Sequence, residues 1–202
     1  MIMDSLFISP LLNQLAERIA KLPCQTMPLP SAVLIAITDE IHPRILYTLR
    51  ATHLNQHGGE VSFAGGKREP SDTHNASIAL RETWEETGIL PERVTVIGEL
   101  PLQYAKSGMP VMPIVGVIPP DVVITPDIGE IARVFWGDLA TVATQATVEY
   151  RLDYQGQQIV SPSFIVDGET VWGLTGRITA SLLEIGFDRK IAWEYQIKPL
   201  QG

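Results

Sequence analysis

Residues 81–89 read Arg81-Glu82-Thr83-Trp84-Glu85-Glu86-Thr87-Gly88-Ile89. At about 100° per residue on an α-helix, Glu82, Glu85 and Glu86 share an arc of roughly 100°. A separate face collects mostly small side chains, namely Ala76, Ala79, Leu80, Thr83 and Thr87. Gly88 is suited to end the helix, because glycine takes the left-handed conformation without strain. The pattern predicts a helix that packs closely on one face and gathers negative charge on another.

Repulsion among the three glutamates makes this charged face informative. A like-charge pair such as Glu82 and Glu86 costs an isolated helix about 0.2–0.5 kcal/mol, and a bound divalent cation reverses that cost. Hard cations such as Mg²⁺ take one or two carboxylates and complete their shell with water and phosphate oxygens. Arg81, four residues before Glu85, can hold that carboxylate in a fixed orientation. An ordinary solvated helix face is the alternative, and the neighbouring arginine and glycines weigh against it.

The segment upstream of this helix reads Gly65-Gly66-Lys67-Arg68-Glu69-Pro70-Ser71-Asp72. The glycine pair predicts a turn in which main chain approaches a diphosphate closely and points amide donors at it. Candidate phosphate-binding cations are Arg50, Lys67 and Arg68, with a solvated surface position as the alternative for each. His57 is a further candidate for substrate contact, and its alternative is a hydrogen-bonded structural role.

These residues resemble the Nudix hydrolases, whose sequence box reads G-x5-E-x7-R-E-U-x-E-E-x-G-U, with U an apolar residue. Arg81 to Gly88 fit the second half of the box, except that Thr83 stands where a larger aliphatic residue is usual. The interval from Gly66 to Arg81 is one residue longer than the pattern, so Glu69 and Asp72 both remain candidates for the first acidic place. The resemblance implies an α/β/α sandwich with a mixed β-sheet and a metal site on this helix.

Residues 50–66 resemble the signature of the coenzyme A diphosphatase branch, which runs roughly R-S-x-x-L-x-x-H-x-G-x-V-x-F-P-G-G. Ala51 replaces the serine and Ala64 replaces the proline. The resemblance implies hydrolysis of coenzyme A or its thioesters to phosphopantetheine, or its acyl form, and adenosine 3′,5′-bisphosphate. Two alternatives stay open: a general hydrolase of nucleoside diphosphate derivatives such as ADP-ribose, and a non-catalytic nucleotide sensor.

The same resemblance implies the roles of individual residues. Glu82, Glu85 and Glu86 would hold Mg²⁺ or Mn²⁺, which would neutralise the diphosphate and lower the pKa of the attacking water. Arg81 and Glu85 would belong to the catalytic group, and Gly65, Gly66, Lys67, Arg50 and His57 would contact the substrate. Glu130, some forty positions beyond the box, is the candidate for a further metal ligand or general base. Asp127 on the same loop is an alternative, as is a merely solvated Glu130.

The hydrophobic pattern predicts a helix over residues 11–22 that ends before Pro23. Further elements are strands at 31–38, 44–49, 94–100, 111–118 and 131–136, a hairpin of strands 150–154 and 158–166 around Gln155-Gly156-Gln157, and a helix at 173–186. This alternation indicates a mixed sheet with helices on its faces. The tail after Phe187 is expected to be loosely structured. We expect one domain over residues 1–202, with the N-terminal helix, within 1–25, packed against a core of about 30–185.

Composition excludes several classes of function. The chain has 202 residues, 45% of them hydrophobic, a net charge of −8 and a pI near 5.0. An acidic chain without clustered lysine and arginine argues against a nucleic-acid surface. Cys24 is the lone cysteine, which excludes an internal disulfide and a cysteine–histidine zinc cluster. No signal peptide or membrane span is evident, so we expect a cytoplasmic protein without a membrane partner. The oligomeric state stays open, with a homodimer among the alternatives.

Overall fold

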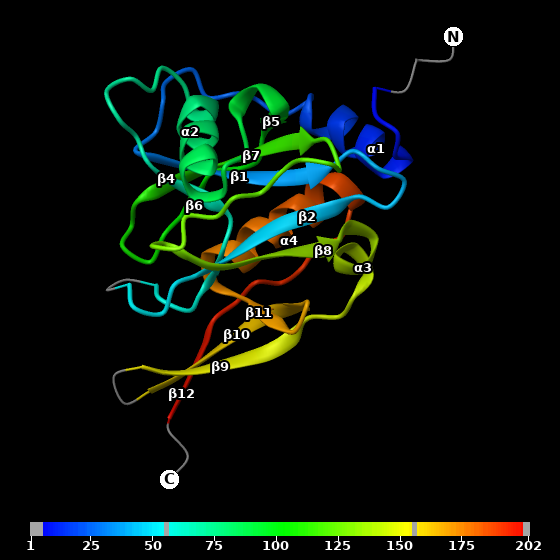
Figure 1. The fold of residues 1–202 in the computed structure, drawn as a ribbon. Helices are drawn as coiled ribbons and strands as arrows, with labels where there is room; N and C mark the ends of the chain where they lie inside the picture. Colours follow the sequence, from blue (N-terminus) through cyan, green and yellow to red (C-terminus); the bar gives the residue numbers. More distant parts are fainter. Residues whose placement is uncertain (1–5, 55–56, 155–156, 200–202) are drawn as a thin grey trace.

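The computed structural model describes residues 6–54, 57–154 and 157–199 (Figure 1). Its main sheet has the strand order β3-β2-β1-β7-β5, with β4 also pairing β1, β6 pairing β7 and β8 pairing β2. Only the β1–β7 pair is parallel among these strands, so the sheet is mixed, as predicted. The strands are β1 Ser31–Thr38, β2 Arg44–Arg50, β3 Val61–Ser62, β4 Ala64–Lys67, β5 Thr95–Glu99, β6 Gln103–Tyr104, β7 Pro110–Ile118 and β8 Ile131–Asp138.

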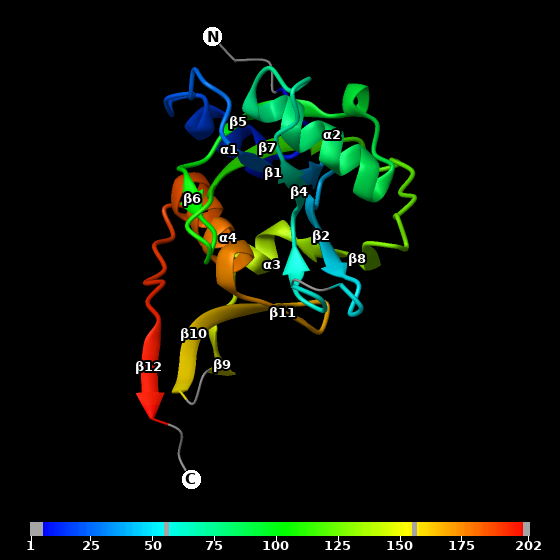
Figure 2. The same ribbon diagram turned by 90° about the vertical axis from the view of Figure 1, so that its left-hand side faces the viewer.

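Strand β1 is apolar from residue 32 to residue 37, as expected for a strand that is buried on both faces. Leu34 belongs to a buried cluster with Ile78 and Ala79 of helix α2, Asn75–Thr87. Ile35 and Ile37 belong to the cluster on the other face, which includes helices α1, Pro10–Ile19, and α4, Gly173–Phe187. Figure 2 shows α2 and α4 on opposite sides of the sheet. The fold is therefore the α/β/α sandwich that the sequence predicted.

Helix α2 is defined at both ends by local hydrogen bonds. His74 Nδ1 accepts a hydrogen bond from the Ser77 amide at its start, and Gly88, with φ of 75°, ends it as predicted. Thr83 and Thr87 are buried and donate their hydroxyl hydrogens to carbonyls one turn earlier in the helix. The packed face of the helix can therefore contain polar residues, and Glu86 lies on that face.

A second sheet extends away from the sandwich at its C-terminal end (Figures 1 and 2). It contains β9 Val148–Tyr154, β10 Gln157–Val166, β11 Glu169–Val171 and β12 Gln196–Pro199. Strands β9 and β10 form the predicted hairpin, starting two residues and one residue earlier than predicted. Its connecting residues 155–156 lie outside the described part of the chain. Phe164 and Val166 of β10 join the same buried cluster as Ile35, so the base of this sheet is continuous with the core.

Three expectations about local structure were wrong. Helix α1 ends at Ile19 and not at residue 22. Gly65 and Gly66 lie in strand β4 and pair with Val33 and Ala32 of β1, so they are not a turn. The tail after Phe187 is not loose throughout, because β12 pairs with β10 from Gln157 to Val160. The remaining described elements are the short helix α3, Leu139–Thr144, and the 3₁₀ turn η1, Pro91–Arg93.

Candidate metal and phosphate site

Glu86 is a carboxylate buried on the packed face of α2, with 5% of its surface exposed. Its Oε2 accepts a hydrogen bond from the Gly65 amide at 3.2 Å, and Arg50 Nη1 lies 3.6 Å from its Oε1. Burial raises the pKa of Glu86 to about 8; Arg50 and the Gly65 amide oppose the rise, while Glu130 and Glu82 add to it. Burial therefore favours the protonated form of this carboxyl group in the absence of a bound cation.

Glu82 lies one helical turn before Glu86 and directly against Gly66. A Cβ atom at residue 66 would lie 2.4 Å from the Glu82 Cδ, so only glycine leaves room for this carboxylate. Burial raises the pKa of Glu82; Arg81 opposes the rise, and Glu85 and Glu130 add to it. The glycine pair, expected to present amides to a phosphate, instead contacts carboxylates: Gly65 donates to Glu86 and Gly66 makes room for Glu82.

Arg81 links these carboxylates to the segment before the helix. Its Nη1 donates to Glu85 at 3.0 Å, which is the contact that the four-residue spacing predicted. Its Nη2 donates to Glu82 Oε1 at 3.1 Å, to Asp72 Oδ2 at 3.1 Å and to the Lys67 carbonyl at 2.8 Å. A guanidinium with this many short contacts is fixed in place and holds Glu82 and Glu85 in one orientation.

Asp72, and not Glu69, points inward from the segment before the helix. Asp72 is 3% exposed, whereas Glu69 is exposed. Although burial acts to raise it, hydrogen bonds from Arg81 and from the Glu69 amide hold the pKa of Asp72 below its ordinary value. Of the two acidic residues, Asp72 is the one that contacts Arg81.

Glu130 is exposed and lies at the end of the loop between β7 and β8, which runs beside the end of α2. The Thr125 amide donates to the Thr87 carbonyl at 2.8 Å and the Asp127 amide donates to the Glu86 carbonyl at 3.0 Å. This position explains why the charge of Glu130 raises the pKa of both Glu82 and Glu86. Asp127 differs, because its Oδ1 accepts a hydrogen bond from the Gly129 amide at 2.8 Å within its own turn.

Glu82, Glu86 and Glu130 supply the oxygen donors that a hard divalent cation prefers. Burial is the main cause of the raised pKa of Glu86, and the charges of Glu130 and Glu82 add to it; a divalent cation bound here would favour the charged form of all three carboxylates. Within residues 6–54, 57–154 and 157–199, however, no three acidic, histidine or cysteine side chains are arranged to ligate one ion together. In this arrangement Arg81 pairs with Glu82, and Arg50 pairs with Glu86. Carboxylate oxygens that are now paired with arginines would have to turn toward the ion. With that change, this set of carboxylates fits a divalent metal.

The other residues that were predicted to contact substrate lie around these carboxylates and differ in their solvent exposure. Lys67 is exposed, and its carbonyl, which was not singled out from the sequence, accepts from Arg81. The exposed ring of His57 pairs with Glu60, with Nδ1 3.0 Å from Oε2, which is the structural alternative considered for it. His53 was missed: its Nε2 lies 3.1 Å from the Gly129 carbonyl and ties the loop after β2 to the Glu130 loop. No spacing in the sequence indicates that contact.

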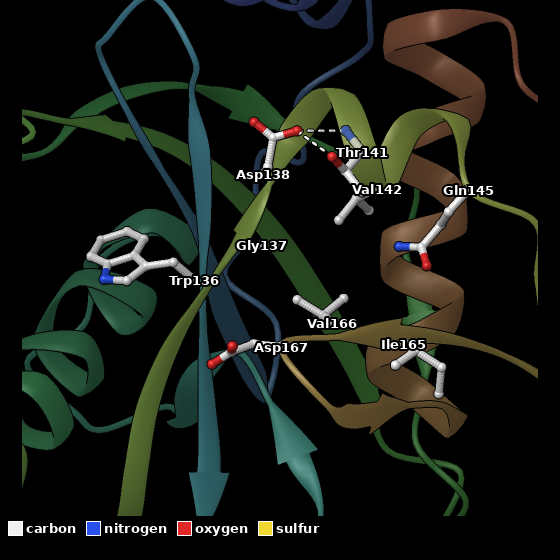
Figure 3. A pocket seen from close by; sticks show the side chains of 9 residues that line it. All are labelled: Trp136, Gly137, Asp138, Thr141, Val142, Gln145, Ile165, Val166 and Asp167. Carbon is white, nitrogen blue, oxygen red and sulfur yellow. Dashed lines mark hydrogen bonds between the residues drawn. The ribbon is translucent and has the colours of Figure 1, made fainter.

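A separate pocket of about 190 Å³ lies near the far end of β8 (Figure 3). Strand β8 begins beside Glu130 and ends at Asp138, and eight residues of strand span about 25 Å. Figure 3 shows Asp138 bonded back to Thr141, and Asp167 pairs with Arg133. Because its carboxylates are paired with the protein itself and it is remote from the α2 carboxylates, this pocket does not belong to the site.

No helix in the described part of the chain has the length and apolar character needed to cross a membrane. The NUDIX domain family matches residues 28–149. The Nudix hydrolase NudL of Escherichia coli O7:K1 is 43% identical over 110 residues, which cover 54% of this chain and 57% of that protein. The Nudix hydrolase NudL of Enterobacter sp. strain 638 is 36% identical over 159 residues, which cover 77% of this chain and 82% of that protein. The chain thus aligns with little more than half the length of the first of these relatives.

Solved structures with a similar fold include the NUDIX domain of Shewanella oneidensis NrtR in complex with ADP ribose. It is 17% identical, covers 65% of this chain and 87% of its own, and has a TM-score of 0.45. The Nudix hydrolase RenU of M. smegmatis is 21% identical, covers 57% of this chain and 73% of its own, and has a TM-score of 0.47. The family match spans strands β1 to β8 and the carboxylate helix α2. The chain is therefore a member of the Nudix hydrolase family.

Proposed function

We propose that this Nudix hydrolase cleaves the diphosphate of coenzyme A or its thioesters. The products would be phosphopantetheine, or its acyl form, and adenosine 3′,5′-bisphosphate. One observation supports the proposal: Arg50 at the start and Gly65 near the end of the segment that resembles the coenzyme A diphosphatase signature both lie against the same buried carboxylate. Arg50 Nη1 lies 3.6 Å from Glu86, and the Gly65 amide donates to it at 3.2 Å. The substrate signature is thereby joined to the metal helix.

Nudix hydrolases use divalent metal ions, and Mg²⁺ or Mn²⁺ is proposed here. Glu82 and Glu86 would hold the ion, with Glu85, whose side chain is 49% exposed, as a further ligand. Glu130 would be either another ligand or the general base. When bound, such an ion neutralises the diphosphate and lowers the pKa of the attacking water. Arg81 keeps Glu82 and Glu85 in place through its bonds to Asp72 and the Lys67 carbonyl.

Hydrolysis then depends on where the proton of the water goes. The water oxygen attacks phosphorus, the bond from phosphorus to the bridging oxygen breaks, and the departing phosphate takes the electron pair. Glu130 is the proposed base because its carboxylate is exposed and lies close enough to affect both Glu82 and Glu86. Exposed Lys67 and the guanidinium of Arg50 are proposed to bind the phosphate oxygens.

A general hydrolase of nucleoside diphosphate derivatives such as ADP-ribose is the second candidate. The departures from the signature at Ala51 and Ala64 favour it, because they are the places where the coenzyme A pattern fails. Both residues are only 4% exposed, and Ala64 pairs with Leu34 inside the sheet. Departures at buried positions change packing and do not alter Arg50 and Lys67, the residues proposed to bind phosphate oxygens. A non-catalytic sensor is disfavoured by the intact glutamates Glu82 and Glu86.

Purified protein with Mg²⁺ should be tested against coenzyme A, ADP-ribose and dinucleotides, with products identified by mass spectrometry. We expect adenosine 3′,5′-bisphosphate from coenzyme A and no turnover with excess chelator. Glu86→Gln should lower kcat by about two orders of magnitude with the fold intact, because a charged ligand is removed. The matched control Glu69→Gln changes an exposed carboxylate and should retain full activity. Near-wild-type turnover in Glu86→Gln would rule out the proposed metal site.

A further inference from the structure

Two arginines lie beside the α2 carboxylates, and they are held in different ways. Arg81 makes direct hydrogen bonds of 2.8 Å to the Lys67 carbonyl and 3.1 Å to Asp72. Arg50 Nη1 lies 3.6 Å from Glu86 Oε1, longer than the roughly 2.7–2.9 Å of a charge-assisted hydrogen bond. Arg81 is therefore fixed, whereas Arg50 is attracted to Glu86 by charge without a short hydrogen bond.

The backbone aims Arg50 at this carboxylate. The register between β2 and β8 shifts between Leu49 and Arg50, and such an irregularity redirects a side chain. Arg50 donates its amide hydrogen to the Glu60 carbonyl at 3.0 Å and accepts from the Gly59 amide at 3.0 Å, so its main chain is fixed. In the described part of the chain, Glu86 is the one residue with which the guanidinium forms an ion pair. The side chain can move while its Cα stays in place.

The oxygen that Arg50 faces is the one that a metal ion needs. Glu86 Oε2 already accepts from the Gly65 amide, and Oε1 faces the guanidinium. An ion that binds Oε1 would place two positive charges side by side in a largely buried setting, where they repel strongly. The side chain of Arg50 is 24% exposed and that of Glu86 is 6% exposed, so the arginine has an outward path and the glutamate does not.

We propose that Arg50 is a movable counter-charge that pairs with Glu86 in the metal-free enzyme and passes to the substrate diphosphate when the metal binds. This inference rests on the proposed function. Without substrate, Arg50 and the metal ion compete for the Glu86 carboxylate. With substrate, the displaced guanidinium can bind the two phosphate groups of the diphosphate. Metal and diphosphate therefore strengthen each other's binding, and the coupling must be equal in both directions.

The test compares Arg50→Gln with Arg133→Gln as the matched control. Arg133 comes from β8, is paired in register with Leu49, and forms ion pairs with Asp167 and Glu169. Calorimetric titration with Mn²⁺ alone should show about fivefold or greater tightening in Arg50→Gln, within the usual range of coupling between sites. The same variant should lose most of the Mn²⁺-dependent affinity for inorganic pyrophosphate. Arg133→Gln should match the wild type in both titrations.

Unchanged or weaker Mn²⁺ binding in folded Arg50→Gln would overturn the role of Arg50. Arg50→Lys, which keeps the charge, should bind Mn²⁺ nearly as the wild type does. Should Arg50→Gln fail to fold, NMR of the guanidinium nitrogens in the wild type replaces it: the Arg50 signal must shift on Mg²⁺ addition while that of Arg133 does not, and a static Arg50 signal refutes the inference.

Glu86→Gln separates this inference from the proposed function. Mn²⁺ binding that survives Glu86→Gln unchanged would contradict the metal site itself. Binding that is lost in Glu86→Gln, with no gain in Arg50→Gln, would contradict only the movable counter-charge.

Discussion

The carboxylate of Glu82 occupies the space beside Gly66 in which any other residue would carry its Cβ atom. An added Cβ would lie 2.4 Å from the Glu82 carboxylate. At the neighbouring Gly65, an added Cβ would instead meet the main chain of β1, 2.4 Å from the Ala32 carbonyl oxygen. Two adjacent glycines therefore have separate reasons to be glycine, and the two substitutions should have different consequences.

Gly66→Ala should keep the protein folded while displacing the Glu82 carboxylate, because a flexible side chain can move aside. We expect weaker Mn²⁺ binding and at least about tenfold lower kcat, with a small change in Tm. Gly65→Ala should destabilise the fold by about 2–3 kcal/mol or more, because backbone atoms cannot yield. Calorimetric Mn²⁺ titration and thermal unfolding measure both effects. The same substitution should be made in a Glu82→Ala variant, which has no carboxylate to displace. If Gly66→Ala still weakens Mn²⁺ binding there, displacement of the Glu82 carboxylate is not the cause.

Glu86 gives the metal-free protein a pH dependence with a defined sign. Burial raises its pKa from an ordinary 4.5 to about 8, so the folded state binds more protons than the unfolded state between these values. The stability contributed by Glu86 is complete below about pH 4.5 and falls by up to about 1.4 kcal/mol per pH unit as pH rises toward 8. Urea unfolding in the presence of EDTA should show this slope. Glu86→Gln should remove it, and an unchanged slope in that variant would contradict the assignment.

Asp72→Asn should weaken the interaction with the Arg81 guanidinium, because a neutral amide replaces the buried carboxylate. We expect a loss of about 1–3 kcal/mol at pH 7 and lower kcat. Since the folded-state pKa of Asp72 is lowered, its stabilisation is present above the unfolded pKa and is lost as pH falls through the folded one. Glu69→Gln, at the alternative acidic position, should change neither stability nor kcat. Equal effects in the two variants would mean that Asp72 has no special role.

Glu130→Gln should depress kcat far more than it raises KM, because the loss falls on the transition state. Asp127→Asn is the matched control on the same loop. Asp127 accepts a hydrogen bond from the Gly129 amide, which an asparagine oxygen also accepts, so its kcat should stay near that of the wild type. Steady-state kinetics decide between the two carboxylates. A larger loss of kcat in Asp127→Asn than in Glu130→Gln would reverse their roles.

The helix could be predicted from sequence, as could the closeness of Glu82, Glu85 and Glu86 around its axis, because both follow from helical geometry. The prediction of a separate charged face was wrong in one respect, because Glu86 is buried on the packed face. Strand β4 could not, because a Gly-Gly pair is typical of a turn and only pairing with β1 makes it a strand. Asp72 and Glu69 remained alternatives because the segment is one residue longer than the pattern, and it is burial and the contact with Arg81 that distinguish them. The ion pair of Arg50 with Glu86 joins β2 to α2 across 36 residues of sequence, so no local pattern indicates it. Contacts between residues that only the strand pairing brings together could not be predicted from the sequence.

The substrate proposal is tested most directly by competition. When coenzyme A and ADP-ribose are mixed at equal concentrations with Mg²⁺, the ratio of their initial rates of product formation equals the ratio of their kcat/KM values. The account predicts that adenosine 3′,5′-bisphosphate forms well ahead of AMP at equal substrate concentrations. Faster release of AMP from ADP-ribose would contradict the coenzyme A assignment while leaving membership of the Nudix hydrolases intact.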